Sequence, residues 1–406
     1  MGKLATGTLG VGVTYATRER HNSGMRILLA PNAFKGSLSA REVADIAGAQ
    51  LSAMFPGSQF AMLPIADGGD GTLDVLLAVG FSRVSVSTVD ALMRANKSRI
   101  ALQGATAVIE FAEICGLAGV QDLATRPWDT SSFGVGLAAR EALIQGAKHL
   151  LIALGGSAST DGGLGLLAGL GYQLRDDSGD EVPPTASGLL RVSSIGPSVN
   201  QELIDGCTWT LLVDVDSPAC GPFGAAHVFG PQKGLSEAEC YQVDAAMREW
   251  CRVVAHHSGR FTVGELEELP GAGAAGGIAV AASGVIGAQI ESGAEAIARL
   301  TDLSSAVDDV DAVVIGEGRL DEQTLAGKGP AFVAAIAKAA GKPVYALAGS
   351  STLTAKQGEE LGIRTKGDVV TLVEVAGSLD AALGDPRIWL VKAVEVLGQR
   401  LQTSGL

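Results

Sequence analysis

The sequence has little of what a nucleic-acid-binding, disulfide-stabilised or zinc-binding protein needs. Its 406 residues carry 30 Lys+Arg against 44 Asp+Glu, a net charge of −14, with no Lys/Arg-rich run. Because nucleic-acid binding needs a basic surface that neutralises phosphates, we expect no nucleic-acid partner. The five cysteines are scattered and form no C-x-x-C pair. This argues against a disulfide framework or a zinc site and favours the reduced thiols of a cytoplasmic protein.

Several sequence signatures of function are also missing. The phosphate loop G-x-x-x-x-G-K-[ST] does not occur, because Gly327-Lys328 is followed by Gly329, and neither does the G-x-S-x-G motif of serine hydrolases. Residues 1–24 lack the cleavage pattern of a secretory signal, so we expect a leader or a disordered extension there. The uncharged stretch 269–290 is mostly glycine and alanine. We interpret it as a glycine-rich loop that enters a buried helix, and we expect no membrane partner.

What the chain does have is glycine and aliphatic side chains. It contains 55 glycines, against roughly 28 at average usage. Hydrophobic residues make up 47% of the chain and aromatic residues 4%. So many apolar side chains can bury a core that offsets the entropy of the chain, which argues against disorder. The length predicts two or three domains.

Strand-like and helix-like segments alternate along the chain. Near-continuous apolar runs such as Arg26–Ala30, Leu150–Leu154 and Ala312–Ile315 are typical of buried parallel strands. A capping box of Ser39 and Glu42 predicts a helix that runs to about Met54. Further helices are expected at 134–146, 237–255, 323–340 and 387–402. This alternation predicts an α/β fold.

Polar, glycine-bearing segments follow five of the predicted strands. In open α/β sheets, ligands bind outside the carboxyl ends of the strands. We therefore expect these segments to assemble into one site. They begin at Pro31, Asp67, Gly155, Asp214 and Gly316.

The residue types in these segments match phosphoryl transfer. Glycine-rich loops that open helices, as at 155–163 and 271–277, present backbone N–H groups to anions. Cations neutralise phosphate charge, and carboxylates hold Mg²⁺ or accept the proton of the attacking hydroxyl. The candidate cations are Lys35, Lys233, Arg319 and Lys328, and the candidate carboxylates are Asp67, Asp70, Asp214, Asp216 and Asp321.

An NAD-dependent oxidoreductase acting on a small 2-hydroxy acid remains the alternative. The pattern G-x-G-x-x-G occurs at Gly271, Gly273 and Gly276, with Glu291 twenty residues beyond the first glycine. That fingerprint must follow a strand, whereas the residues before Gly271 are acidic and end in proline. Serine hydrolysis ranks behind both readings, because none of the five histidines has an evident partner.

Seven segments in register resemble the bacterial glycerate kinases of the first type. Together they extend from about residue 25 to the C-terminal region. They are 26–39, 64–72, 155–163, 214–222, 229–234, 270–277 and 316–328. The sequence departs from the family pattern at Asn32-Ala33, where Asp-Ser is expected, and at Asp70, where Glu is usual.

The resemblance implies ATP-dependent phosphorylation of D-glycerate with Mg²⁺, with 2-phosphoglycerate preferred over 3-phosphoglycerate as product. It also implies two α/β domains with the active site in the cleft between them. A Rossmann-like three-layer domain would comprise 25–78 and 291–406, and a second α/β domain, 79–290, would be inserted between these parts. We expect a cytoplasmic monomer or homodimer that binds glycerate and ATP.

The site residues follow from the motifs at the strand ends. We expect catalytic roles for Lys35, Asp67, Asp216 and Arg319, and metal binding by Asp214 and Asp321. The absence of an acid at position 32 shifts the base and metal roles to these aspartates. Substrate or phosphate binding is expected of Ser37, Gly68, Gly69, Gly155, Gly156, Ser157, Ser159, Lys233, Gly273, Gly276 and Lys328.

Overall fold

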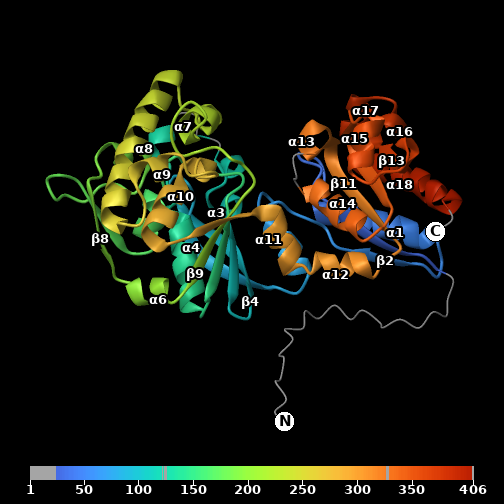
Figure 1. Ribbon diagram of the computed structural model, residues 1–406, viewed down its shortest axis with the longest axis horizontal. Coiled ribbons are helices and arrows are strands. Elements are labelled where there is room, and N and C mark those ends of the chain that lie inside the picture. Colours follow the sequence, from blue (N-terminus) through green and yellow to red (C-terminus); the bar gives the residue numbers. More distant parts are fainter. Residues whose placement is uncertain (1–23, 121, 123–125, 326–328, 405–406) are drawn as a thin grey trace, which may run out of the picture.

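The described part of the chain contains two large sheets, each covered by helices, in agreement with the predicted α/β fold. The computed structural model describes residues 24–120, 122, 126–325 and 329–404. In Figure 1 a six-stranded sheet with its helices lies on the left and a five-stranded sheet with its helices on the right. Helices α11 (Gly293–Leu300) and α12 (Leu303–Asp308) lie between them.

The five-stranded sheet combines strands from both ends of the chain. All its strands are parallel, in the order β13-β12-β11-β1-β2. They are β1 (Arg26–Pro31), β2 (Gln59–Met62), β11 (Ala312–Leu320), β12 (Val344–Ser351) and β13 (Val369–Thr371). Because β1 pairs with β2 on one side and with β11 on the other, the turns that follow β1 and β11 end side by side.

The six-stranded sheet comes from the middle of the chain. Its order is β10-β9-β6-β5-β4-β3, antiparallel from β3 to β5 and parallel from β5 to β10. The strands are β3 (Ser82–Val89), β4 (Ala95–Gln103), β5 (Thr106–Glu110), β6 (His149–Ala153), β9 (Thr208–Val213) and β10 (Gln289–Ser292). A separate antiparallel pair consists of β7 (Tyr172–Arg175) and β8 (Ser194–Ser198).

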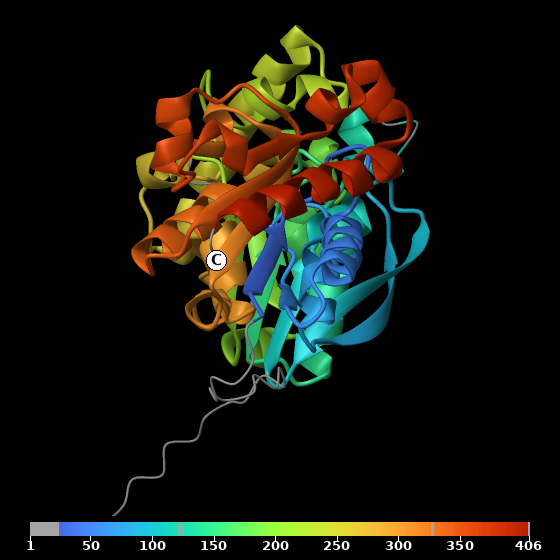
Figure 2. The same ribbon diagram turned by 90° about the vertical axis from the view of Figure 1, so that its right-hand side faces the viewer.

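Both faces of the five-stranded sheet are buried. Ile27 and Leu29 of β1 pack under α1 (Ala40–Met54) and α18 (Pro386–Thr403), the blue and red helices in front of the sheet in Figure 2. Leu28 and Ala30 point to the opposite face, into a core shared with α2 (Thr72–Ala78), α14 (Gly329–Ala339) and the six-stranded sheet. Burial on both faces explains the near-continuous apolar run of this strand.

The predicted helices form, with small shifts at their ends. The capping box of Ser39 and Glu42 starts α1 as expected, because the Ser39 side chain accepts from the Glu42 N–H. The helices expected at 134–146 and 237–255 are α4 (Phe133–Ile144) and α8 (Glu237–Ser258). The one expected at 323–340 is described as two helices, α13 (Glu322–Leu325) and α14, which adjoin the undescribed 326–328.

The glycine-rich stretch after residue 269 enters buried helical turns, as interpreted from its composition. It leads into α10 (Ile278–Ala281), whose residues are all buried. The segment before it forms α9 (Val263–Glu267) and a turn, so the strand that a dinucleotide-binding fingerprint requires is not there. Among the helices of the described ranges, none is long and apolar enough to cross a membrane.

Candidate active site

The loops at the carboxyl ends of the strands surround two adjoining cavities. The small cavity, of about 480 Å³, is lined by the turn after β1, by the carboxyl ends of β11 and β12, and by the segment after β13. The large cavity, of about 820 Å³, is lined by the turns after β1, β6 and β9 and by the loop 67–71. Six residues line both cavities, and we call them the shared wall: Asn32, Ala33, Phe34, Lys35, Ser37 and Asp67.

A tight turn after β1 presents Lys35 to both cavities. The Phe34 N–H donates to the Leu38 carbonyl oxygen at 2.8 Å, and the Ser37 hydroxyl donates to the Phe34 carbonyl oxygen at 2.9 Å. Gly36 completes the turn with φ +78°, a conformation that other residues seldom adopt. Phe34 is buried and anchors the turn, whereas Lys35 and Ser37 are exposed to the cavities.

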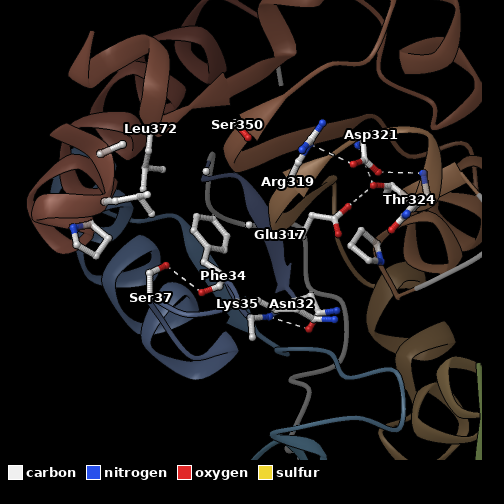
Figure 3. Close-up of a pocket in the computed structure, with 18 of the residues that line it drawn as sticks. Asn32, Phe34, Lys35, Ser37, Glu317, Arg319, Asp321, Thr324, Ser350 and Leu372 are labelled. Carbon is white, nitrogen blue, oxygen red and sulfur yellow. Dashed lines mark hydrogen bonds and ion pairs between the residues drawn. The ribbon is translucent and has the colours of Figure 1, made fainter. Parts of the chain in front are cut away.

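A polar cluster at the end of β11 forms one side of the small cavity, as Figure 3 shows. The Thr324 hydroxyl donates to Glu317 Oε1 at 2.5 Å. Arg319 Nε lies 3.1 Å from Asp321 Oδ2, and Asp321 Oδ1 accepts from the backbone N–H of Gln323 at 2.9 Å. The cluster therefore holds a cation and two carboxylates in fixed positions.

Glu317 is the carboxylate of this cluster that the sequence analysis did not select. Burial raises its pKa to about 7, the bond from Thr324 opposes that rise, and the charge of Asp321 adds to it. Lys35 lowers the pKa of Glu317 and Asp67 raises it, so all these charges act on one another across the cavity. The signal was a lone glutamate between two glycines directly after a buried strand, at 316–318.

Two glycine loops meet backbone to backbone in the large cavity. The Gly155 N–H donates to the Gly68 carbonyl oxygen at 3.1 Å. A Cβ atom at Gly155 would lie 2.4 Å from the Gly69 Cα atom. This is closer than two non-bonded carbon atoms can approach. The Asp67 carboxylate accepts from the Gly69 N–H at 3.3 Å. Glycine is therefore required at position 155 for contact between loops, and its amide is already bonded within the protein.

A buried lysine lies in the wall of the large cavity. Lys233 is 2% exposed, and its Nζ donates to the Ser157 Oγ at 3.0 Å and the Ser159 carbonyl oxygen at 2.6 Å. Burial lowers its pKa to about 7, and the charge of Asp161 opposes that shift. Asp161 is itself buried, and it accepts four hydrogen bonds from Ser132, Gly163 and Gly165. Burial raises the pKa of Asp161.

Glu110 fixes the loop that carries Asp67. It lies at the end of β5 and accepts from the N–H groups of Gly71 and Leu73, at 3.0 and 2.9 Å, where α2 begins. Burial raises its pKa to about 7, and these two backbone bonds oppose the rise. Sequence reasoning missed Glu110, because it ends a strand and precedes no glycine.

Most of the predicted site residues line one or both cavities. Asp214 lines the large cavity, where its carboxylate accepts from the Gly293 N–H at 3.1 Å. Arg319 and Asp321 line the small cavity. The other predicted residues in the linings are Lys35, Ser37, Asp67, Gly68, Gly69, Gly155, Gly156, Ser157 and Lys233.

Four predicted residues lie outside the two linings. Ser159 is fully buried behind Lys233, and Asp216 is exposed beyond the end of β9. The Gly273 N–H donates to the Ser217 carbonyl oxygen at 2.8 Å, and a Cβ at Gly276 would lie 2.2 Å from the Ser159 oxygen. Both glycines thus pack against backbone. Lys328 lies outside the described residues.

The carboxylates fit a magnesium ion that arrives with phosphate. Within the described part of the chain, no group of three or more His, Cys, Asp or Glu side chains is positioned to hold a metal. Mg²⁺ in phosphoryl transfer sites uses one or two carboxylates together with phosphates and waters. Asp67, Glu317 and Asp321 lie on the cavity walls where one or two could serve.

Comparison with known proteins gives one consistent result. The family model described as "Glycerate kinase family" matches residues 27–402. Glycerate 2-kinase of Escherichia coli (strain K12) is 36% identical over 363 residues, 88% of this chain and 93% of that protein. Glycerate kinase of Bacillus subtilis (strain 168) is 36% identical over 330 residues, 80% of this chain and 85% of that protein.

A solved structure is similar over almost the whole chain. It is a crystal structure from Salmonella typhimurium LT2, provisionally named glycerate kinase 2, with a TM-score of 0.76 and 32% sequence identity. The similarity covers 94% of this chain and 100% of that one.

Proposed function

The chain belongs to the glycerate kinase family of enzymes, and we propose that it transfers the γ-phosphoryl group of ATP to a hydroxyl of D-glycerate. The observation that carries this proposal is the shared wall, where Lys35 and Asp67 border both cavities. A donor in one cavity and an acceptor in the other would meet at this wall. A cation and a carboxylate are the two groups that the transfer needs there.

The proposed reaction is a single displacement at the γ-phosphorus. The glycerate hydroxyl oxygen forms a bond to phosphorus, the bond to the bridging oxygen of ADP breaks, and ADP leaves. Asp67 accepts the hydroxyl proton. Of the two aspartates predicted as base we favour Asp67, because it borders both cavities whereas Asp216 lies outside both linings.

The cations bind and stabilise negative charge. Lys35 and Arg319 neutralise the transferring phosphoryl group from two sides of the small cavity. Ser157, held by Lys233, orients the acid in the large cavity. The two loops that border the acid can approach each other closely because they contain glycine, at Gly68, Gly69, Gly155 and Gly156.

Bound Mg²⁺ would offset the charge of the phosphate oxygens. We propose that Asp321 and Glu317 hold it on the small-cavity side, because both carboxylates line that cavity. Asp214, the other predicted ligand, lines only the large cavity. Asp214 would then face the acceptor and not the phosphates.

We propose 2-phosphoglycerate as the product. The support is the name of the Escherichia coli relative, glycerate 2-kinase, with 36% identity over most of both chains. The difference between the two products is which of two neighbouring hydroxyls faces Asp67.

We also propose the domain division that the sequence suggested, with one adjustment. The five-stranded sheet and its helices would form the domain of 25–78 and 291–406, and the six-stranded sheet the inserted one. Strand β10 continues to Ser292 within the six-stranded sheet. We therefore place the second boundary after Ser292. A cytoplasmic monomer or homodimer remains our expectation.

An ADP-release assay with D-glycerate and related 2-hydroxy acids tests the proposal, with ³¹P NMR of the product. We expect ADP release that depends on D-glycerate and Mg²⁺, and the phosphorus signal of the 2-phosphate ester. Absence of ADP release with every acid, or a change in NADH absorbance without ADP, would contradict it. A signal from the 3-phosphate ester would overturn only the position.

A further inference from the structure

The small cavity has two chemically different halves. One half holds the polar cluster of Glu317, Arg319 and Asp321. The other half is apolar and is built by the segment after β13: Leu372, Leu379, Ala382, Leu383 and Pro386. Figure 3 shows this division, with Leu372 on one side of Phe34 and Arg319, Asp321 and Thr324 on the other.

The apolar half exposes large side chains without apolar cover. Leu379 and Leu383, both on α17 (Leu379–Gly384), are 55% and 60% exposed. Contact with water on this scale is unfavourable for leucine, and the two residues share one cavity wall with Leu372 and Pro386. A ligand with an apolar part would remove this surface from water.

The two halves together match the shape of one kind of ligand. Glycerate is a three-carbon acid with a polar group on every carbon, so it has no apolar surface to place against leucines. A nucleoside triphosphate has a flat base at one end and a chain of phosphates at the other. Of the cations that suit the phosphates, Arg319 lies on the other side of Phe34 from Leu372 in Figure 3, and Lys35 follows Phe34 in the turn.

Resting on the proposed function, we infer that the apolar half of the small cavity is the binding site for the base of the donor nucleotide. The base packs against Leu379 and Leu383, and the phosphates pass Ser350 and Phe34 toward Lys35 and Arg319. The large cavity then takes glycerate, with the shared wall between donor and acceptor.

The large cavity offers the competing location, because Phe229 and Leu117 also give it apolar wall. We assign it to the acid, since its wall contains Lys233 and Ser157, a cation and a hydroxyl that suit a small carboxylate. Lys233 is absent from the lining of the small cavity.

The test replaces both leucines by a neutral polar residue, in the double variant Leu379→Gln and Leu383→Gln of the full chain. Glutamine keeps the length and the helix propensity, so α17 is retained and no charge is added near the phosphates. The matched control is Leu190→Gln, because Leu190 is 56% exposed and lines neither cavity. Thermal unfolding of all variants checks that the fold is intact.

We expect the KM for ATP to rise about tenfold or more in the double variant, because contact with two leucines is lost. The KM for D-glycerate should change less than about twofold. Inhibition by inorganic tripolyphosphate, which has phosphates but no base, should be unchanged. Leu190→Gln should leave all three quantities unchanged.

Three outcomes would overturn the assignment. The first is an unchanged KM for ATP in the double variant while the wild-type enzyme turns over normally. This would show that the base does not bind against α17, and the proposed function would stand. The second is a KM for ATP that rises in Phe229→Gln but not in the double variant, which would place the base in the large cavity. Wild-type enzyme without any ATP-dependent turnover of glycerate overturns the proposed function and this assignment with it.

Discussion

Lys35 and Arg319 reach one cavity from the carboxyl ends of neighbouring strands of the same sheet: Lys35 from the turn after β1, Arg319 from the last residues of β11. β1 and β11 are paired in parallel, so their carboxyl ends lie side by side and both side chains project beyond the same edge. Arg319 is held by Asp321 at 3.1 Å, and Lys35 stands on the turn anchored by Phe34. The side chain of Arg319 and the backbone of Lys35 are therefore both held at the cavity, and we expect the loss of either cation to slow the reaction.

We expect Lys35→Ala and Arg319→Ala each to lower kcat by about 100-fold or more, because transition-state charge is no longer neutralised. Steady-state kinetics with saturating ATP and D-glycerate measure the effect. Lys97→Ala, at an exposed position on β4, is the control and should retain wild-type turnover. Near-wild-type kcat in both site variants would refute the assigned roles.

Lys233 predicts a pH dependence of stability. Burial lowers its pKa to about 7 in the folded chain, whereas an unfolded lysine titrates near 10.4. Between these values the unfolded chain binds more protons, so the free energy of unfolding should rise with pH. Below about pH 7 the cost of the buried charge is fully present.

Denaturant unfolding at pH 6.5 and pH 9 measures this dependence. We expect wild type to gain on the order of 2–3 kcal/mol relative to Lys233→Met across that interval. The reason is that methionine has no proton to release. If the difference in free energy of unfolding between the two proteins stays constant with pH, or falls as the pH rises, the pKa of Lys233 is not lowered in the folded chain.

At the scale of elements, the site depends on loops that touch through glycine. The loop 67–71 leads into α2 and the loop 155–157 follows β6, and Gly155 meets Gly68 and Gly69 at their point of contact. Glu110 holds the first of these loops from β5. Three elements thus fix the backbone that presents Asp67.

We expect Gly155→Ala to destabilise the protein by about 1–3 kcal/mol and to lower kcat at least about tenfold, because a Cβ there forces the loops apart. The control is Gly264→Ala in α9, where a Cβ would have no atom within 4 Å. Alanine is the better helix former there, so the control should be neutral or slightly stabilising. Equal behaviour of the two variants, in unfolding and in turnover, would contradict the role of loop contact.

At the scale of the whole molecule, the large cavity lies between loops of two sheets that share one core. Leu28 of β1 and Leu151 of β6 belong to the same buried cluster. The large cavity of about 820 Å³ far exceeds a three-carbon acid. Water would remain beside the transferring phosphoryl group unless the walls approach each other.

We therefore expect the molecule to become more compact when both substrates bind. Small-angle scattering with D-glycerate and a non-hydrolysable ATP analogue together should give a smaller radius of gyration than the free protein. Either ligand alone should give a smaller change. An unchanged radius with both ligands would argue against closure.

The sequence predicted those parts of the fold and site that carry a local signal. Buried strands such as β1 and helices with caps such as α1 were found, because apolar runs and the Ser39–Glu42 pair are visible in a short window. β4 was missed, since its first half contains Asn96, Lys97 and Arg99 and so lacks an apolar run.

The remaining site residues depend on contacts between distant segments. Nothing near Glu110 in the chain shows that it caps α2, which begins at Thr72. The glycines at 273 and 276 carried a phosphate-binding pattern, but the packing of Ser159 and Ser217 explains why glycine is needed at both. The need for glycine at these positions, and the role of Glu110, depend on residues that are distant in the sequence and close in the fold. A local sequence motif carries no information about such contacts.

The position of β1 in its sheet has a consequence for how the chain is made. β1 leaves the ribosome early, but its partner β11 is far behind; the Arg26 N–H bonds to the Asp311 carboxylate, 285 residues further on. At 5–20 residues per second, roughly 15–60 s of synthesis separate the two. During that time one edge of a mostly apolar strand is unpaired, while every strand of the six-stranded sheet is already available. Nascent chains halted before residue 312 should therefore depend on chaperones far more than the finished enzyme does.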